Sequence, residues 1–200
     1  MKEPFRQFIK SKIEGGFLLI SCGLPGTGKT GTTEVAHQVK GGTLLKSDII
    51  RREVLKGQDI FSPEVAGDES KRARVYDEMF RQADAALAAE PNVILDATFI
   101  TQSLRRRAAG IAAGHGAALI ILETVCPEDI CLARILARDK ATSVSNAVTE
   151  EAYLSNKDRF EAIDLDDLKK RYPALKLVYL AVDTSKASPE AWQVTKYEER

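Results

Sequence analysis

The chain has 200 residues, and its 44% hydrophobic and 29% charged residues are ordinary proportions for one globular domain spanning 1–200. Its 29 basic and 29 acidic residues give a formal net charge of zero, which excludes a global basic field for holding long nucleic acid. The longest apolar run, residues 117–122, is too short to cross a bilayer, and the charged N-terminus lacks a signal-peptide pattern, so we expect a cytoplasmic protein without membrane contact.

Apolar runs of strand length alternate with helical patterns along the chain. The expected strands cover residues 17–22, 43–45, 93–95, 119–125 and 175–182. The expected helices cover residues 29–39, 49–56, 70–89, 102–113, 127–140 and 150–163, with a last helix near 189–198. Strands this uniformly apolar are usually covered on both faces. We therefore predict an α/β fold with a parallel sheet and a ligand site where the strands end.

Residues 23–30 read GLPGTGKT, a complete P-loop directly after the first expected strand. Its glycines let the backbone wrap closely around phosphate oxygens, and the start of the following helix adds N–H donors. Lys29 would place a charge beside the β and γ phosphates, and Thr30 would offer a hydroxyl to Mg²⁺. We assign nucleotide binding to these residues of the loop: Gly23, Gly26, Thr27, Gly28, Lys29 and Thr30.

Transporters, GTPases, motors and kinases share this motif, so it predicts a nucleoside triphosphate ligand without naming a reaction. The competing interpretation is a glycine-rich turn followed by a surface lysine.

Asp48 follows the second expected strand, and Arg51 comes three residues later on the next helix. Residues at this spacing share one helix face, so both side chains can reach one cleft. A carboxylate placed against an alcohol can orient it and take its proton, while an arginine can hold a polar or anionic part of the acceptor. The alternative is a helix-capping aspartate with a local ion pair.

Asp96 ends the expected strand VILDAT, at the sheet edge where a magnesium ion or its water shell would need an oxygen ligand. At this place its carboxylate could instead fix Arg51. A purely structural alternative is an aspartate that caps a loop.

Arg134 and Arg138 are four residues apart on an expected helix, with no acidic residue three or four positions from either. Like charges at this spacing repel unless an anion meets them, so we assign both to the nucleotide. Because Arg138 precedes the polar stretch 141–149, residues of about 138–150 are expected to form a small helical lid that excludes water. Compensation of the helix dipole is the alternative role for both arginines.

Arg105, Arg106 and Arg107 form the densest basic run. Consecutive residues of a helix point in different directions, so we interpret the run as solvated. The segment 57–69 contains four acidic and no basic residues, which makes it a poor lining for a polyanion track.

Taken in chain order, the P-loop, Asp48-x-x-Arg51, Asp96 and the Arg134/Arg138 helix resemble the P-loop kinases of the polynucleotide 5′-hydroxyl kinase and zeta-toxin kind. The chain is most similar to the bacterial "predicted kinase" branch of that group, whose domains also occur fused to aminoglycoside-phosphotransferase-like domains. This resemblance is carried by the stretches SDIIRREVLKG, FSPEVAGDESKRARVYDEM and VILDATFITQSLRRRAA.

The resemblance implies a three-layer P-loop NTPase fold with a five-stranded parallel sheet, Mg-ATP as donor and a hydroxyl group as acceptor. It also implies that Asp48 is the general base, that Arg51 binds substrate and that Asp96 supports this pair. By the same resemblance, Arg138 is the lid arginine that contacts the nucleotide.

We therefore predict an ATP- and Mg²⁺-dependent kinase whose acceptor is a hydroxyl of a small molecule or of a short nucleic-acid 5′ end. The alternatives are a nucleotide-binding switch or regulatory ATPase without a phosphoacceptor, and a degenerate domain that only binds a partner. The assigned residues are Lys29, Asp48 and Arg138 for catalysis, Asp48, Arg51 and Asp96 for the substrate, and Thr30 and Asp96 for the metal.

Overall fold

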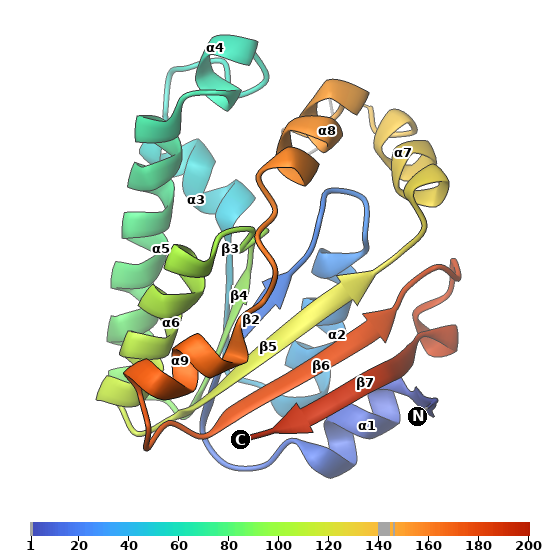
Figure 1. Ribbon diagram of the computed structural model, residues 1–200. Coiled ribbons are helices and arrows are strands. Elements are labelled where there is room, and N and C mark those ends of the chain that lie inside the picture. The colour runs from blue at the N-terminus through green and yellow to red at the C-terminus, as the bar shows by residue number, and fades with distance from the viewer. Residues whose placement is uncertain (1, 140–144, 146) are drawn as a thin grey trace.

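The computed structural model describes residues 2–139, 145 and 147–200. Within this part of the chain, seven strands form one sheet in the order β1-β7-β6-β5-β2-β4-β3. Figure 1 shows the sheet between layers of helices, with further helices beyond the ends of its parallel strands. The strands are β1 (Glu3–Pro4), β2 (Phe17–Cys22), β3 (Thr43–Lys46), β4 (Asn92–Asp96), β5 (Ala118–Val125), β6 (Leu177–Asp183) and β7 (Gln193–Glu199).

The centre of the sheet matches the apolar runs of the sequence. β2 lies between β4 and β5 and pairs in parallel with both, while β3 extends the sheet beside β4 and β6 extends it beside β5. Every residue of β2 is buried, because helices cover both faces of this strand. The predicted α/β fold is confirmed. Five strands are parallel, as predicted, but the whole sheet is larger and mixed, since β7 adds antiparallel to β6 and β1 adds antiparallel to β7.

The helix expected near residues 189–198 is also wrong. Pro189–Ala191 make a short 3₁₀ turn, and the residues after it form β7. Trp192 and Val194 are buried while Gln193 and Thr195 are exposed, which is the alternation of a strand with one covered face. Pairing with β7 satisfies the backbone hydrogen-bonding groups along the edge of β6. A helix in this place would leave those groups without hydrogen-bond partners.

Helices cover the two faces of the sheet in separate layers (Figure 1). α1 and α2 pack on one face, and α3, α5, α6 and α9 pack on the other. α7 and α8 lie beyond the carboxyl ends of the parallel strands and contact each other through Cys131, Ile135 and Tyr153. Among the described residues, no helix is both long and apolar enough to cross a membrane. The helices are α1 (Phe5–Lys12), α2 (Lys29–Lys40), α3 (Ser47–Val54), α4 (Pro63–Ala66), α5 (Glu69–Ala89), α6 (Gln102–Gly114), α7 (Glu128–Leu136), α8 (Glu150–Asp158) and α9 (Leu165–Arg171).

The ends of two expected helices differ from the structure. The helix expected over 127–140 ends at Leu136, and residue 140 lies outside the described residues. The helix expected over 150–163 ends at Asp158, and α9 follows as a separate element that begins after Asp164. The Asp164 carboxylate accepts from Asp167 N at 2.9 Å, which gives α9 its own N-terminal cap.

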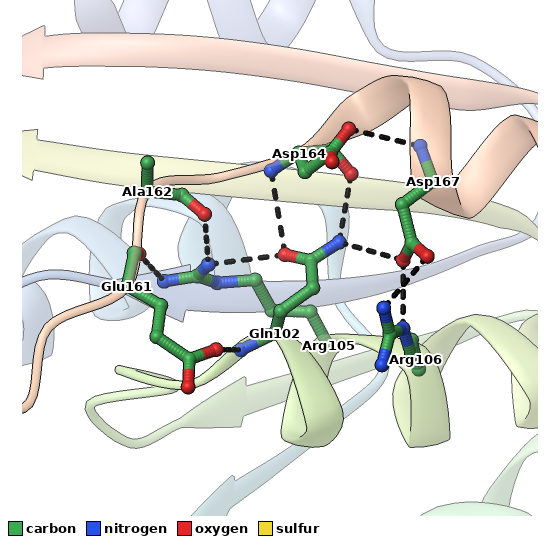
Figure 2. A network of polar contacts seen from close by, with 7 residues as sticks. All are labelled: Gln102, Arg105, Arg106, Glu161, Ala162, Asp164 and Asp167. Carbon is green, nitrogen blue, oxygen red and sulfur yellow. Dashed lines mark hydrogen bonds and ion pairs between the residues drawn. The ribbon is translucent and has the colours of Figure 1, made fainter.

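The interpretation of the basic run as solvated is wrong for Arg105, whose side chain is fully buried. Figure 2 shows its guanidinium group between the start of α6 and the segment that joins α8 to α9. Its five N–H donors all find acceptors. These bonds are Nε to Phe99 O at 3.0 Å, Nη1 to Gln102 Oε1 at 3.1 Å and Ala162 O at 3.0 Å, and Nη2 to Ile100 O at 3.2 Å and Glu161 O at 2.8 Å.

This network fixes a loop that helps to build the site. Phe99 has a positive φ of 44°, which is rare for a residue with a side chain. Its carbonyl accepts from Arg105, and its N–H donates to Tyr76 Oη at 3.2 Å. Arg106 and Arg107 are partly exposed, as the sequence predicts, and pair with carboxylates of other helices.

Candidate nucleotide and acceptor site

The P-loop joins the end of β2 to the start of α2. Gly26 and Gly28 have φ values of 80° and 83°, a left-handed conformation that favours glycine. A Cβ at Gly26 would lie only 2.5 Å from the carbonyl oxygen of Cys131, so a side chain does not fit. On another side of the loop, the ring of Trp192 packs against Gly31, where a Cβ would lie 2.5 Å from it. Because Gly28 is the N-cap of α2, the free N–H groups of that helix begin at the loop and can bind an anion.

Hydrogen bonds to residues at the ends of neighbouring strands hold the P-loop in place. Thr27 Oγ1 lies 2.6 Å from Thr124 Oγ1 on β5, and Thr184 Oγ1 donates to Thr27 O at 2.6 Å just after β6. Gly23 N donates to Thr98 O at 3.1 Å after β4. Three strand ends therefore fix the position of the P-loop.

Lys29, Thr30 and Asp96 form the polar centre of the site. Lys29 Nζ donates to Leu24 O at 2.7 Å, so its ammonium group lies over the loop. Withdrawal from bulk water lowers the pKa of Lys29 to about 8, and the charge of Asp96 opposes this shift. Thr30 Oγ1 donates to Asp96 Oδ2 at 2.7 Å. Burial raises the pKa of Asp96 above its ordinary value, against the effect of this hydrogen bond.

The Thr30 and Asp96 oxygens fit a magnesium site that substrate completes. Mg²⁺ prefers oxygen ligands and is usually held by one or two carboxylates, several waters and phosphate oxygens. Thr30 and Asp96 supply one hydroxyl and one carboxylate, which contact each other and both line the cavity described below. Within the described part of the chain, no cluster of three or more His, Cys, Asp or Glu side chains could hold a metal ion.

Asp48 and Arg51 lie on the first turns of α3 and form an ion pair through Oδ1 and Nη1. Arg138 lies just past α7, and its Nη1 donates to Ala147 O at 2.6 Å. Burial lowers the pKa of Arg138 and the Asp48 charge opposes this effect, so the two groups act on one another across the site. Asp96 contacts Thr30, whereas Arg51 contacts Asp48.

A cavity of about 890 Å³ connects these groups. This volume is near the upper end of the range of roughly 300–1,000 Å³ that ligand pockets span. The P-loop forms one part of its wall, and α3, α5 and α8 form others. The site residues expected from the sequence that line it are Gly26, Gly28, Lys29, Thr30, Asp48, Arg51, Asp96 and Arg138.

Gly23, Thr27 and Arg134 do not line this cavity. Gly23 and Thr27 contact the strand ends behind the loop, as described above. Arg134 Nη1 donates to Gly26 O at 3.2 Å, and its Nη2 donates to Thr184 O at 2.7 Å. Arg134 therefore ties α7 to the P-loop and to the segment after β6, while direct contact with a nucleotide stays a prediction.

The predicted lid over about 138–150 lies partly outside the described residues, which omit 140–144 and 146. The described residues of this segment that line the cavity are Arg138, Ser145 and 147–149. α8 follows directly, and Ala152, Ser155 and Asn156 continue the same wall. α8 thus covers part of the space between the P-loop and α5.

The polar residues of the cavity wall that sequence reasoning missed include Arg72, Tyr76 and Thr98. Arg72 and Tyr76 lie four residues apart on α5 and so share one helix face. Tyr76 Oη lies 3.2 Å from Thr98 Oγ1, which links α5 to the residues after β4. The spacing of Arg72 and Tyr76 is visible in the sequence, but only the packing of α5 beside β4 shows which face meets the cavity.

A P-loop at the carboxyl edge of a parallel sheet, with a partly buried lysine and a threonine–aspartate pair at one end of a large cavity, defines a P-loop nucleotide-binding protein. Residues 18–163 match the model of an AAA domain family, and the chain belongs to that family. A search of curated protein sequences gives no significant match.

Solved structures of kinases share the fold at low sequence identity. A gluconokinase from Sinorhizobium meliloti 1021 aligns with a TM-score of 0.54 at 15% identity, covering 86% of this chain and 84% of its own. A sugar kinase from Janibacter sp. HTCC2649 aligns with a TM-score of 0.55 at 14% identity, covering 83% and 85%. A presumed kinase from Chloroflexus aurantiacus j-10-fl aligns with a TM-score of 0.62 at 20% identity, covering 86% and 90%. At these identities the alignments show the fold, and the polynucleotide kinase or zeta-toxin group stays a prediction.

Proposed function

We propose that this protein is a magnesium- and ATP-dependent kinase that transfers the γ-phosphoryl group to a hydroxyl of a small molecule. The observation that carries the proposal is the shared cavity. Lys29 and Thr30 line the same cavity as Asp48 and Arg51. A triphosphate bound on the P-loop would therefore face a carboxylate and a guanidinium group across open space.

Each residue has a role that its position supports. The backbone N–H groups at the start of α2 and the Lys29 ammonium bind the phosphates. Thr30 and Asp96 would hold Mg²⁺, which neutralises phosphate charge when bound. Asp48 accepts the proton of the acceptor hydroxyl, since a carboxylate at this place can orient the alcohol and act as base.

Arg51 and Arg138 supply positive charge on the acceptor side and the lid side of the cavity. Arg51 holds Asp48 in place and can bind a polar part of the acceptor. Arg138 connects the lid segment to the cavity through Ala147, so lid closure would bring its charge onto the transferred phosphoryl group.

Two similar structures support a small acceptor, because they are named as a gluconokinase and a sugar kinase. The segment 57–69, with four acidic and no basic residues, also disfavours a long polyanion. A short nucleic acid with a free 5′-hydroxyl is the alternative acceptor.

The test is a transfer assay with γ-labelled ATP and, in parallel, labelled GTP against sugars, sugar acids, nucleosides, aminoglycosides and 5′-hydroxyl oligonucleotides. With the acceptor found, Asp48→Asn should lower kcat about 100- to 10,000-fold, the range for loss of a general base. Its affinity for ATP should stay within a few-fold of wild type, because Asp48 lies on α3 and pairs with Arg51 rather than with a residue of the P-loop.

Asp77→Asn is the matched control, since the Asp77 carboxylate is 60% exposed on α5 and does not line the cavity. Wild-type turnover by Asp48→Asn would rule out the proposed base. Release of phosphate that no acceptor accelerates would instead favour a regulatory ATPase, and failure to bind ATP in calorimetry would favour a domain that only binds a partner.

A further inference from the structure

Arg72 stands at the start of α5, in the wall of the cavity opposite the P-loop. The helix start is firmly capped: Asp68 Oδ1 accepts from Ser70 N at 2.8 Å and from Lys71 N at 3.2 Å. Arg72 N donates to Asp68 O at 3.1 Å, and Arg72 Nη2 donates to Ala66 O at 3.1 Å. Arg72 is thus fixed at two points: its backbone N–H bonds within the helix start, and one of the two terminal nitrogens of its guanidinium group bonds a backbone carbonyl.

The other terminal nitrogen, Nη1, is buried and has no hydrogen-bond partner among the described residues. Among the described residues, the only other buried side-chain nitrogen or oxygen without a hydrogen-bond partner is Asn92 Oδ1. Asn92 is the first residue of β4, at the opposite end of this strand from Asp96. A buried donor of a charged group without a partner destabilises a protein, so such groups call for an explanation.

No carboxylate neutralises Arg72 within the described part of the chain, although other arginines of the site region have ionic partners. The residues outside that part, 1, 140–144 and 146, include no Asp or Glu. Arg51, also in the cavity wall, already pairs with Asp48. Arg72 therefore brings an unneutralised positive charge to the acceptor side of the cavity.

The surroundings of Arg72 favour a small organic ligand. Phe61 and Val65 give the adjoining wall an apolar surface, and Tyr76 adds a hydroxyl one turn along α5. An apolar wall with a few converging polar groups is the usual make-up of a small-molecule pocket. Guanidinium groups bind carboxylate and phosphate oxygens strongly, because their donors match the geometry of both.

We propose that the acceptor carries, in addition to its reactive hydroxyl, an anionic carboxylate or phosphate group that the Arg72 guanidinium group binds. This inference rests on the proposed kinase function and makes it narrower: the substrate is a hydroxy acid or a phosphorylated alcohol. Asp48 meets the hydroxyl while Arg72 binds the anionic group, so the two residues together set which hydroxyl is phosphorylated.

The experiment compares anionic acceptors with neutral ones of matched length, as substrates with ATP. The carboxylate arm pairs gluconate with glucitol, and the phosphate arm pairs glycerol 3-phosphate with glycerol, within a wider set built in the same way. Wild type should prefer the anionic member in one arm. Arg72→Gln should raise KM for that member about 10- to 100-fold, as expected for a lost charge-assisted hydrogen bond, and leave KM for ATP unchanged.

Arg74→Gln is the matched control, because Arg74 is exposed on the same helix, bonds only a backbone carbonyl of α3 and does not line the cavity. Arg72→Lys keeps the charge without the planar fork and should give an intermediate KM. It also provides a folded comparison if Arg72→Gln is unstable, which thermal melting would reveal.

The outcomes separate this inference from the proposed function. Equal use of neutral and anionic acceptors, or a preference that Arg72→Gln retains, would overturn the anionic subsite while the kinase stands. If no acceptor is phosphorylated, calorimetric binding of gluconate and glycerol 3-phosphate decides. Binding that Arg72→Gln abolishes supports the subsite without the kinase, and absence of binding to wild type refutes it.

Discussion

Replacement of Arg105 by lysine tests whether hydrogen-bond geometry, rather than charge, stabilises the join between α6 and the segment after α8. Arg105 is fully buried, and its five donors reach five acceptors. Figure 2 draws three of these bonds, to Gln102, Glu161 and Ala162. Lysine keeps the positive charge but has only three donors on one nitrogen. At least two of these five hydrogen bonds must then be lost.

The expected loss follows from that count. A hydrogen bond made by a charged group contributes about 1.5–3 kcal/mol, so two lost bonds amount to roughly 3–6 kcal/mol of unfolding free energy. A domain of this size has about 5–15 kcal/mol in total, and each kcal/mol shifts Tm by about 2–4 °C. Arg105→Lys should therefore lower Tm by roughly 5–20 °C.

The assay is denaturant and thermal unfolding of Arg105→Lys beside Arg107→Lys, its neighbour in the same basic run. Arg107 pairs with Asp77 at the surface, where the side chains are 46% and 60% exposed. Exposed pairs contribute at most about 1 kcal/mol, so this control should stay close to wild type. An Arg105→Lys variant within about 0.5 kcal/mol of wild type, the range of ordinary surface substitutions, would refute the reasoning.

Two further variants test the loop and a surface network. Gly26→Ala should weaken ATP binding at least tenfold in calorimetry, because the new Cβ would lie 2.5 Å from Cys131 O. Gly57→Ala is the control: Gly57 has a similar φ of 85° but open space around it, so ATP affinity should not change. Equal ATP affinities in both variants would contradict this account. Hydrogen bonds from Arg106 and Gln102 lower the pKa of Asp167 from 3.8 to about 2, so the stability that this carboxylate contributes is present above pH 4 and lost as pH falls toward 2. The unfolding free energy of Asp167→Asn should thus lie below that of wild type at pH 7 and converge with it by about pH 2; a gap that does not change with pH would show that the charge is irrelevant.

The parallel core and the P-loop could be predicted from the sequence because their signals are local. Residues 17–22 form an unbroken apolar run, and residues 23–30 follow it with glycines at fixed spacing. Asp48, Arg51 and Asp96 could be assigned to one cavity because parallel strands end at one edge of the sheet. The structure places all three in the wall of one cavity.

Other features depend on contacts that the sequence does not show. Arg105 bonds backbone carbonyls 56 and 57 residues away, and nothing near it in the chain predicts that they meet. β7 carries many charged residues on its exposed positions, and only the open edge of β6 gives it a reason to be a strand. Arg72 has an ordinary helical context, and its unpartnered nitrogen is visible only once α5 is packed beside the site.

The packing of Trp192 on Gly31 has a practical consequence for studying the protein. The chain contains one tryptophan, and its indole borders the helical turn that immediately follows the phosphate loop. The ring is nearly inaccessible to solvent, and its Nε1 donates to Lys186 O at 2.9 Å. Tryptophan fluorescence therefore originates at a single known point beside the loop, so ligand titrations can be followed optically without attaching a dye.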